Sequence, residues 1–457
     1  MNNTEQLGKA NIRQLFFRLT IPAVVAQIIN LLYNIVDRIY IGHMAEVGQA
    51  ALTGAGLFVP ILLLINSFAM LVASGGAPLM SIRLGEGNKK EAEKILGNSF
   101  AALLMISVVL TVVMYLFAPQ LLMFFGASDV TFPYALSYAR IYIIGTVFVV
   151  LALGMNYYIS AQGFAKESML TNLIGAIINI ILDPILIFGF NMGVAGAAIA
   201  TVISQAISAF WVIAFLMGKR TNIRLKKENF KLEKRILNPC LALGVSIFVM
   251  MSTESLLSIT FNHSLAMYGG DLAVGAMTII TSVSSLITMP LNGIAQGAAP
   301  MISYNFGAGK NDRVKKSFKM LLMTCMIYAG VGWILLMLFP KAIASIFTTH
   351  EELLDYAVWA MRIYFAVIFT NAFQIGCQQG FVALGQAKSS LAMAFLRKLV
   401  LLIPLILLLP HFLSNQVFAV FIAEPISDFL AASVTTAFFF LRFNKILAGG
   451  PKNRNQI

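Results

Sequence analysis

The feature that most restricts what this chain can fold into is a succession of long apolar segments. Each has roughly 20 or more residues, enough for a helix to cross a membrane, and there are about twelve of them. With 59% hydrophobic and only 11% charged residues, the chain has more apolar surface than a soluble core can bury. We therefore predict an all-α membrane protein with twelve transmembrane helices. The predicted spans are residues 15–38, 50–82, 96–118, 132–160, 168–190, 193–217, 238–267, 272–304, 317–339, 353–381, 389–410 and 417–441.

The basic residues predict the orientation of these spans. With both termini in the cytoplasm, most of the 32 Lys and Arg residues fall in cytoplasmic segments, and the outer side keeps little beyond Arg38 and Lys341. The net charge of +13 is thus a topological signal and indicates no nucleic-acid partner. We expect a multi-pass protein of the cytoplasmic (inner) membrane, whose first span is retained as a helix.

The chain also contains an internal duplication, because one shift along the sequence aligns several separated positions. The matched pairs are Pro78 and Pro300, Gly85 and Gly307, Arg140 and Arg362, and Lys166 and Lys388. Six spans in each copy, an even number, make the copies parallel repeats. We predict an N-lobe of residues 1–217, a cytoplasmic linker of residues 218–236 and a C-lobe of residues 237–457. Two such lobes around a cleft are typical of transporters.

One carboxylate lies deep within apolar sequence. Between Glu167 and Lys219 the only charged residue is Asp183. A charge inside a membrane is costly, so this side chain should face a cavity, find partners or carry a proton. Asn179 lies one turn earlier, on the same face of the helix. The alternative is an acid and amide pair that only stabilises helix packing.

Two further residues are expected at the depth of Asp183. Counting helix rise from the span ends places Asp37 and Thr201 with it, about 8–12 Å from the outer surface. The predicted ion-coupling site is Asp37, Asn179, Asp183 and Thr201, in which two carboxylates can share a proton. In the alternative interpretation Asp37 pairs with Arg38, and the Thr201 hydroxyl bonds back to its own helix.

Polar residues in other spans are expected to line the cleft, because a polar stripe facing lipid would be costly. In the first span they recur at three- and four-residue spacing: Gln27, Asn30, Tyr33 and Asn34. The expected C-lobe cavity residues are Glu254, Gln378, Arg397, Glu424 and Asp428. By depth Arg397 can pair with Asp428 or Glu254, either as a structural lock or leaving one acid free for a cationic substrate or a second ion.

Five segments are similar to a known family: NLLYNIVDRIYIGHM in the first span, RLGEGNKKEAEK after the second, AQGFAK after the fourth, NIILDPILIFGF in the fifth and GVAGAAIATVISQ in the sixth. Through them the chain resembles the multidrug and toxic compound extrusion (MATE) transporters, and within them the bacterial DinF- and MepA-like branch. The resemblance covers nearly the whole chain.

This resemblance implies two lobes that alternate between outward and inward openings and export small organic cations, driven by H+ or Na+, with no cofactor. It maps the family's N-lobe ion site onto the four residues named above, and an acid of the C-lobe onto Glu254. An aspartate of sodium-linked members in the tenth span has no counterpart in NAFQIGCQQG, which argues against a C-lobe sodium site and favours coupling through the N-lobe. We expect protons rather than sodium as the coupling ion. Asp37, Asn179 and Asp183 would bind a metal only under sodium coupling. We expect a monomer.

Three other functions are compatible with the spans. A flippase for a lipid-linked or bulky anionic substrate needs cationic groups in its cleft, and only Arg397 and Lys398 qualify. An intramembrane enzyme needs a catalytic cluster, but the sequence contains no HExxH or GxSxG motif and no paired His or Cys cluster. The third possible function is that of a channel, but duplicated lobes with a titratable site favour a transporter that alternates between two openings.

Overall fold

The computed structural model describes residues 3–44, 48–348 and 350–451, and within these ranges every regular element is a helix. The N-lobe contains α1 (Asn3–Lys9), α2 (Ile12–Gly42), α3 (Gly48–Leu57), α4 (Val59–Gly85), α5 (Lys89–Phe124), α6 (Phe132–Ile144), α7 (Thr146–Ala161), α8 (Ala165–Pro184), η1 (Ile185–Gly189) and α9 (Gly193–Met217). The linker holds η2 (Lys227–Asn229). The C-lobe contains α10 (Lys234–Gly307), α11 (Asn311–Leu338), α12 (Pro340–Ala344), α13 (Glu351–Tyr364), η3 (Ile368–Thr370), α14 (Asn371–Ala383), α15 (Ala387–Phe395), η4 (Leu396–Leu402), α16 (Ile403–Phe412) and α17 (Gln416–Gly449).

The helices account for all twelve predicted spans. Nine stretches of the described chain are single helices long and apolar enough to cross a membrane, and two bent pairs add two more. The twelfth comes from α10, which joins the predicted spans 238–267 and 272–304 across a break at Gly270, where φ is 64° and ψ is −160°. Only glycine adopts that backbone conformation readily.

Two bends were not predicted from the sequence. The pair α6 and α7 bends by 57°, and α13 bends by 46° relative to the segment of η3 and α14. The first bend lies at Gly145, where a Cβ atom would come within 2.4 Å of the Val202 side chain on α9. The bend is therefore associated with close packing between helices, which periodicity in one segment does not report.

The duplication is reproduced in hydrogen bonds as well as in helix order. The hydroxyl of Ser81 donates to the carbonyl of Ala161 at 2.7 Å, and the hydroxyl of Ser303 donates to the carbonyl of Ala383 at 2.8 Å. Each bond ties the second span of its lobe to the end of the fourth. The two lobes are thus parallel repeats with matching internal contacts, as predicted.

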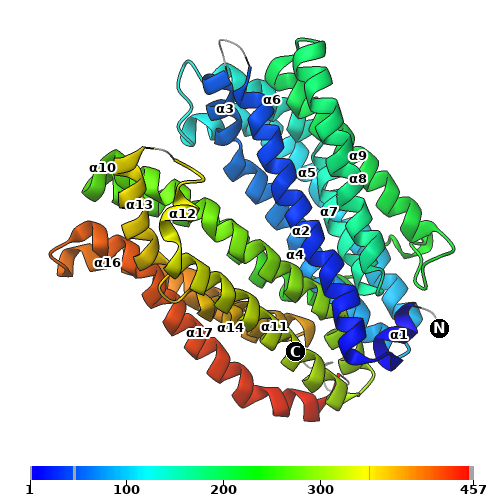
Figure 1. Ribbon diagram of the computed structural model, residues 1–457. Helices are drawn as coiled ribbons and strands as arrows, with labels where there is room; N and C mark the ends of the chain where they lie inside the picture. The colour runs from blue at the N-terminus through cyan, green and yellow to red at the C-terminus, as the bar shows by residue number, and fades with distance from the viewer. Residues whose placement is uncertain (1–2, 45–47, 349, 452–457) are drawn as a thin grey trace.

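The lobes lie side by side at one end and spread apart toward the other (Figure 1). The narrow end holds α1 and the end of α17, and the wide end holds α3 and α16. At the narrow end a Cβ on Gly85 would lie 2.0 Å from the carbonyl oxygen of Tyr304, and one on Gly307 would lie 2.0 Å from that of Ile82. Equivalent glycines of the two repeats therefore bring the lobes into backbone contact there.

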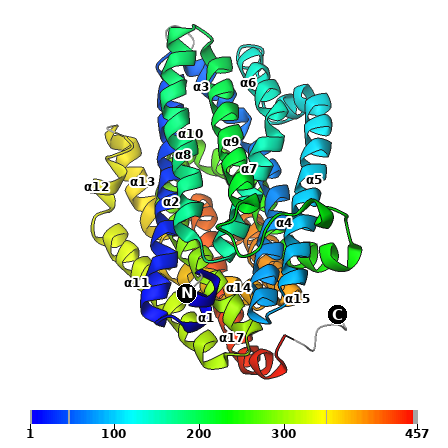
Figure 2. The same ribbon diagram turned by 90° about the vertical axis from the view of Figure 1, so that its right-hand side faces the viewer.

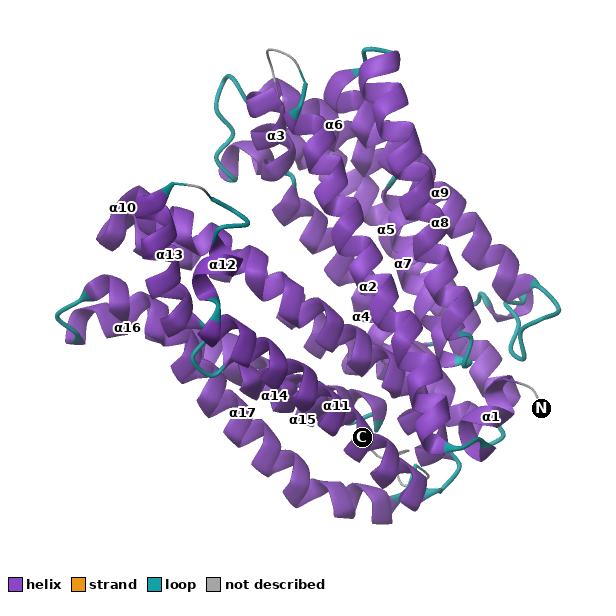
Figure 3. Cartoon of the chain, viewed as in Figure 1, coloured by secondary structure: helices purple, strands orange, loops and turns teal. Residues whose placement is uncertain are grey.

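Each lobe has its own hydrophobic core. In the N-lobe, α2, α8 and α9 run side by side (Figure 2), and short loops join the helices (Figure 3). The beginning of the chain departs from this division, because Leu7, Leu15 and Phe16 pack into the core of the C-lobe. The first residues of the N-lobe therefore pack against the C-lobe.

Candidate ion and substrate sites

A cavity of about 780 Å³ lies between the lobes. Both lobes line it, and its walls combine amide, hydroxyl and methionine side chains with a few charged groups. The predicted cavity residues that line it are Gln27, Asn30, Tyr33, Asn34, Glu254, Arg397, Glu424 and Asp428. Its volume suits a drug-sized organic molecule.

Gln378 is a correction, since the described lining of the cavity includes its neighbour Gln379 and not Gln378 itself. The Gln378 amide donates to the carbonyl of Ser390 at 3.0 Å. In the N-lobe repeat, Asn156 makes the same bond to the carbonyl of Ser168 at 3.2 Å. Gln378 therefore joins two helices of the C-lobe, a role that the duplication could have predicted.

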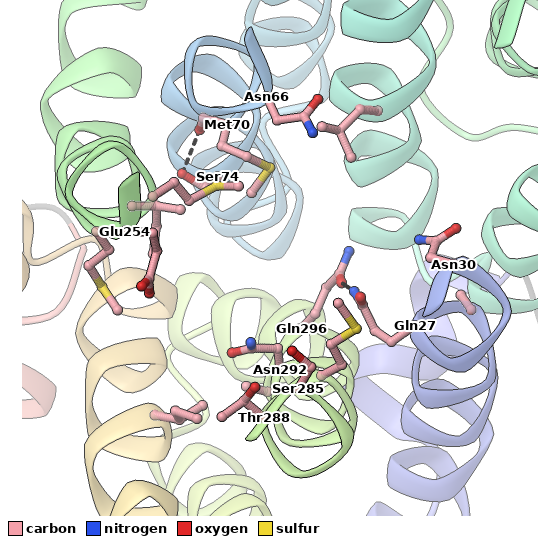
Figure 4. A pocket seen from close by; sticks show the side chains of 18 of the residues that line it. Gln27, Asn30, Asn66, Met70, Ser74, Glu254, Ser285, Thr288, Asn292 and Gln296 are labelled. Atoms are coloured by element: carbon pink, nitrogen blue, oxygen red, sulfur yellow. Dashed lines mark hydrogen bonds between the residues drawn. The ribbon is translucent and has the colours of Figure 1, made fainter. Parts of the chain in front are cut away.

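A second polar stripe was missed from the sequence. In the second half of α10 the cavity is lined by Ser285, Thr288, Asn292 and Gln296, and of these Gln296 lies next to Gln27 of α2 (Figure 4). The Gln27 amide donates to the Gln296 carbonyl oxygen at 3.1 Å, so the two stripes meet across the lobes. Their three- and four-residue spacing was the available signal, the same one that identified the stripe in the first span.

Arg397 pairs with Asp428 rather than with Glu254. Its Nε and Nη2 atoms both lie 2.8 Å from Asp428 Oδ1, and Nη2 lies 3.6 Å from Glu424 Oε1. Arg397 stands in the π-helix η4, a rare conformation that is frequent at functional sites. Pro404 follows shortly after and cannot donate a backbone hydrogen bond, which helps to explain the irregular turn.

Glu254 has a different basic partner, Lys398. The Lys398 ammonium donates to Glu254 Oε1 and, at 3.1 Å, to the carbonyl of Met250. The Glu254 side chain is 56% exposed and that of Lys398 only 5%. Glu254 thus faces the cavity, and the buried Lys398 contacts it from the protein interior.

The predicted N-lobe residues come together in a buried cluster. The Asn179 amide nitrogen donates to Asp183 Oδ1 at 3.2 Å and to the Thr201 hydroxyl at 3.3 Å. The Thr201 hydroxyl in turn donates to the Ala197 carbonyl at 3.0 Å. Both interpretations of Thr201 therefore hold at once, since it bonds to its own helix and accepts from Asn179.

Asp37 reaches this cluster from α2, which packs directly against α8. It lies within electrostatic range of Asp183, and the phenol of Tyr33 lies within electrostatic range of both carboxylates. Among the described residues neither aspartate forms a salt bridge, so the expected alternative of an Asp37–Arg38 ion pair is not observed, although Arg38 is close enough to interact electrostatically. Tyr33 also lines the cavity and so connects it to the cluster.

The cluster has unused acceptor capacity. Three of its buried oxygen atoms accept no hydrogen bond from the described chain: Asp37 Oδ1, Asn179 Oδ1 and Asp183 Oδ2. Buried acceptors without donors are costly, and two nearby carboxylates repel each other when both are ionised. A proton or a monovalent cation would relieve both costs. No group of three or more His, Cys, Asp or Glu that could hold a metal occurs in the described ranges.

Twelve spans in two repeated lobes, with a cavity that both of them line, define a membrane transporter. The chain belongs to the MatE family, whose profile matches residues 22–185 and 246–408, one segment in each lobe. It is a transporter and not an enzyme.

Curated relatives agree with this family. The chain is 24% identical over 424 residues to the multidrug export protein MepA of Staphylococcus haemolyticus, covering 93% of each chain. It is 24% identical over 421 residues to MepA of Staphylococcus aureus (strain MSSA476), covering 91% of this chain and 92% of the relative. The match extends over nearly the whole of each protein.

Solved structures share the fold at low sequence identity. A MATE protein crystallised in the bent conformation superposes with a TM-score of 0.91 at 22% identity, covering 98% of both chains. An outward-facing multidrug resistance MATE family transporter gives 0.89 at 23% identity, covering 96% of this chain and 98% of the other. A MOP superfamily transporter from Pyrococcus furiosus gives 0.90 at 23% identity, with the same coverage. The two-lobe architecture is therefore that of MATE transporters.

Proposed function

We propose that this chain exports small organic cations by cation-coupled antiport, with protons rather than sodium as the coupling ion. The two lobes rock around the shared cavity and expose it to either side of the membrane in turn. Relatives named as multidrug export proteins support a broad range of drug-like substrates. The transport cycle needs no cofactor.

The observation that carries the coupling proposal is the buried cluster around Asp183. Its carboxylate has an amide donor on one oxygen and no donor from the described chain on the other. The cluster spans α2, α8 and α9, so a change in its charge alters the contacts between three helices of one lobe. The Asn179 amide nitrogen donates to both Asp183 and Thr201, so these three side chains form one connected group around the carboxylate.

The charges of the cavity support a cationic substrate. Three lining acids, Glu254, Glu424 and Asp428, face two lining bases, Arg397 and Lys398, and both bases are held by acids. A flippase for a bulky anion would need free cationic groups here. The excess of acid instead attracts positive charge, and the methionine and aromatic side chains offer adaptable apolar contacts.

The proposed topology places the narrow end, both termini and the linker of residues 218–236 in the cytoplasm of a bacterial cell. This orientation follows from the distribution of Lys and Arg. The structure would then be an outward-facing state, with N-lobe 1–217 and C-lobe 237–457 in contact on the cytoplasmic side. A single chain supplies both walls of the cavity, consistent with a monomer.

Transport in proteoliposomes tests this function. The protein should accumulate the organic cation ethidium against a concentration gradient when a pH gradient is imposed, and not when a sodium gradient is imposed. Asp183→Asn should abolish the driven transport and leave the protein folded in the membrane. Asp37→Asn should reduce it as well. Driven transport by Asp183→Asn at the rate of the unmodified protein would remove this residue from the coupling mechanism.

A further inference from the structure

The accessible charge in the cavity belongs to one residue. Arg397, Glu424 and Asp428 line the wall, but their side chains are only 14%, 12% and 6% exposed. Glu254 is 56% exposed and projects into the pocket on the side opposite Gln27 and Asn30 (Figure 4). Among the charged side chains that line the cavity, that of Glu254 is therefore the most accessible to a substrate.

That carboxylate already has a basic partner within the protein, which contacts one of its two oxygens. Lys398 donates to Glu254 Oε1 and is anchored by the Met250 carbonyl, while its own burial keeps it away from the substrate. The second oxygen of Glu254 is left for a ligand. The neighbouring Arg397 is committed to Asp428 and Glu424, so the formal charges of the whole wall, three acids and two bases, sum to minus one.

We propose that Lys398 is a built-in counter-cation that determines substrate charge: with Lys398 in place, the Glu254 site takes organic monocations and discriminates against dications. One positive charge on the ligand neutralises the wall. A second positive charge would be repelled through space by the Lys398 ammonium and the Arg397 guanidinium, with no acid left to balance it, and like charges in a partly dehydrated site repel strongly. This inference rests on the proposed function, and it makes Lys398 a positioning residue that acts through Glu254.

An ion pair that only stabilises the helices would behave differently. Its loss would weaken binding of every ligand to a similar degree, because the cavity wall would be distorted without regard to ligand charge. A charge selector instead changes the ratio of two affinities. Ethidium and propidium are suitable probes, since they share one ring system and carry one and two positive charges.

Equilibrium binding of both dyes to the purified full-length protein, followed by fluorescence anisotropy, tests the proposal. Lys398→Met should improve propidium binding relative to ethidium binding by about tenfold, because Glu254 is then free to balance the second charge. Lys398→Arg keeps the positive charge and should retain the original ratio. An unchanged ratio in Lys398→Met, or the same change in Lys398→Arg, would overturn the proposal.

Lys398→Met leaves the Glu254 carboxylate without its basic partner and could therefore misfold. A second variant controls for this outcome. The double substitution Glu254→Gln and Lys398→Met removes both charges, should fold, and leaves the formal charge of the wall unchanged. It should bind both dyes more weakly, with the propidium-to-ethidium ratio of the unmodified protein. A ratio shifted as far as that of Lys398→Met alone would contradict the proposal that Lys398 sets the charge preference. If the unmodified protein bound neither dye, the proposed function would fail, and the inference with it.

Discussion

Thr201 is the acceptor that orients the Asn179 amide against Asp183. Thr201→Val keeps the shape of the side chain and removes its hydroxyl, so the amide loses one of its two partners. The loss of one neutral hydrogen bond is worth about 0.5–1.5 kcal/mol, and we expect pH-driven transport to fall about threefold to tenfold. Thr201→Ser should transport normally in the same proteoliposome assay. Full activity in the valine variant would show that Asn179 is oriented by other contacts.

The C-lobe acids differ in how strongly the structure depends on them. Asp428 takes two short contacts from Arg397, whereas Glu424 lies at 3.6 Å. Asp428→Ala should destabilise the protein by about 3–5 kcal/mol, because it leaves a buried guanidinium with only a distant acid. Glu424→Ala should cost much less. Thermal unfolding of the purified variants compares them, and equal losses of stability would contradict the assignment of Asp428 as the main partner.

At the scale of residues, helical spacing and depth in the membrane were enough to group the N-lobe polar residues, but they left open which acid pairs with which base in the C-lobe. The four-residue spacing of Asn179 and Asp183 was sufficient to place them on one face, and their hydrogen bond confirms it. The choice of acid for Arg397 was not accessible, because depth alone brought two acids to the same level. The pairing of Lys398 with Glu254 depends on how η4 packs against α10, which no local pattern reports.

Helix contacts at the narrow end depend on the absence of a side chain. A Cβ on Gly85 would lie 2.0 Å from the Tyr304 carbonyl oxygen, a distance at which backbone must move. Gly85→Ala should therefore separate α4 from α10 and lower the thermal stability of the purified protein. Gly330→Ala on α11 is the matched control, because nothing lies within 4 Å of its Cβ position. It should be neutral or stabilising by up to about 1 kcal/mol, so equal losses in both variants would contradict this account.

The short helix α1 connects the lobes at the same end. Thr4 donates to the carbonyl of Gln162 in the N-lobe at 3.1 Å, while Arg313 of the C-lobe donates to the carbonyl of Ala10 at 2.8 Å. Basic groups at the C-terminal end of a helix interact favourably with its free carbonyls. The first residues of the chain therefore form a contact that must break if the narrow end opens.

Arg313→Gln should weaken that contact and favour opening of the narrow end. The expected result is faster labelling of a cysteine introduced in place of Leu7, which is buried against the core of the C-lobe, by a membrane-impermeant thiol reagent. Lys315→Gln, on the same helix but exposed, is the matched control and should leave the labelling rate unchanged. Unchanged labelling in Arg313→Gln would show that α1 does not restrain the lobes.

At the scale of elements, the lengths of the apolar segments predicted the position of every span. They did not predict where the helices end or bend. The helix α5 runs from Lys89 to Phe124, beyond the predicted 96–118, because polar residues continue a helix past the hydrocarbon layer. The bend at Gly145 and the π-helix η4 follow from packing and from a nearby proline. The internal duplication could also have been used to compare the two lobes residue by residue. It aligns Gln378 with Asn156, and each of these amides donates to a serine carbonyl of the next helix in its lobe.

In the whole molecule, the predicted ion-coupling cluster and the substrate cavity lie in different places relative to the two lobes. The Asp183 cluster is enclosed within one lobe, whereas the cavity is shared between lobes. A charge change in the first can alter helix contacts in the N-lobe without touching a substrate in the second, with Tyr33 and α2 as the connection. Coupling in this account is therefore mechanical as well as electrostatic, and it predicts that the lobes move when the cluster changes charge.

The distance between the two lobes at the wide end tests that claim most directly. Spin labels at Val130, next to α6, and Phe412, at the end of α16, sit on well-exposed positions of opposite lobes. In lipid, the distance distribution of the unmodified protein should shift between neutral and acidic pH. Asp183→Asn mimics a permanently neutral acid and should give the acidic distribution at both. A variant that shifts with pH as the unmodified protein does would contradict the account.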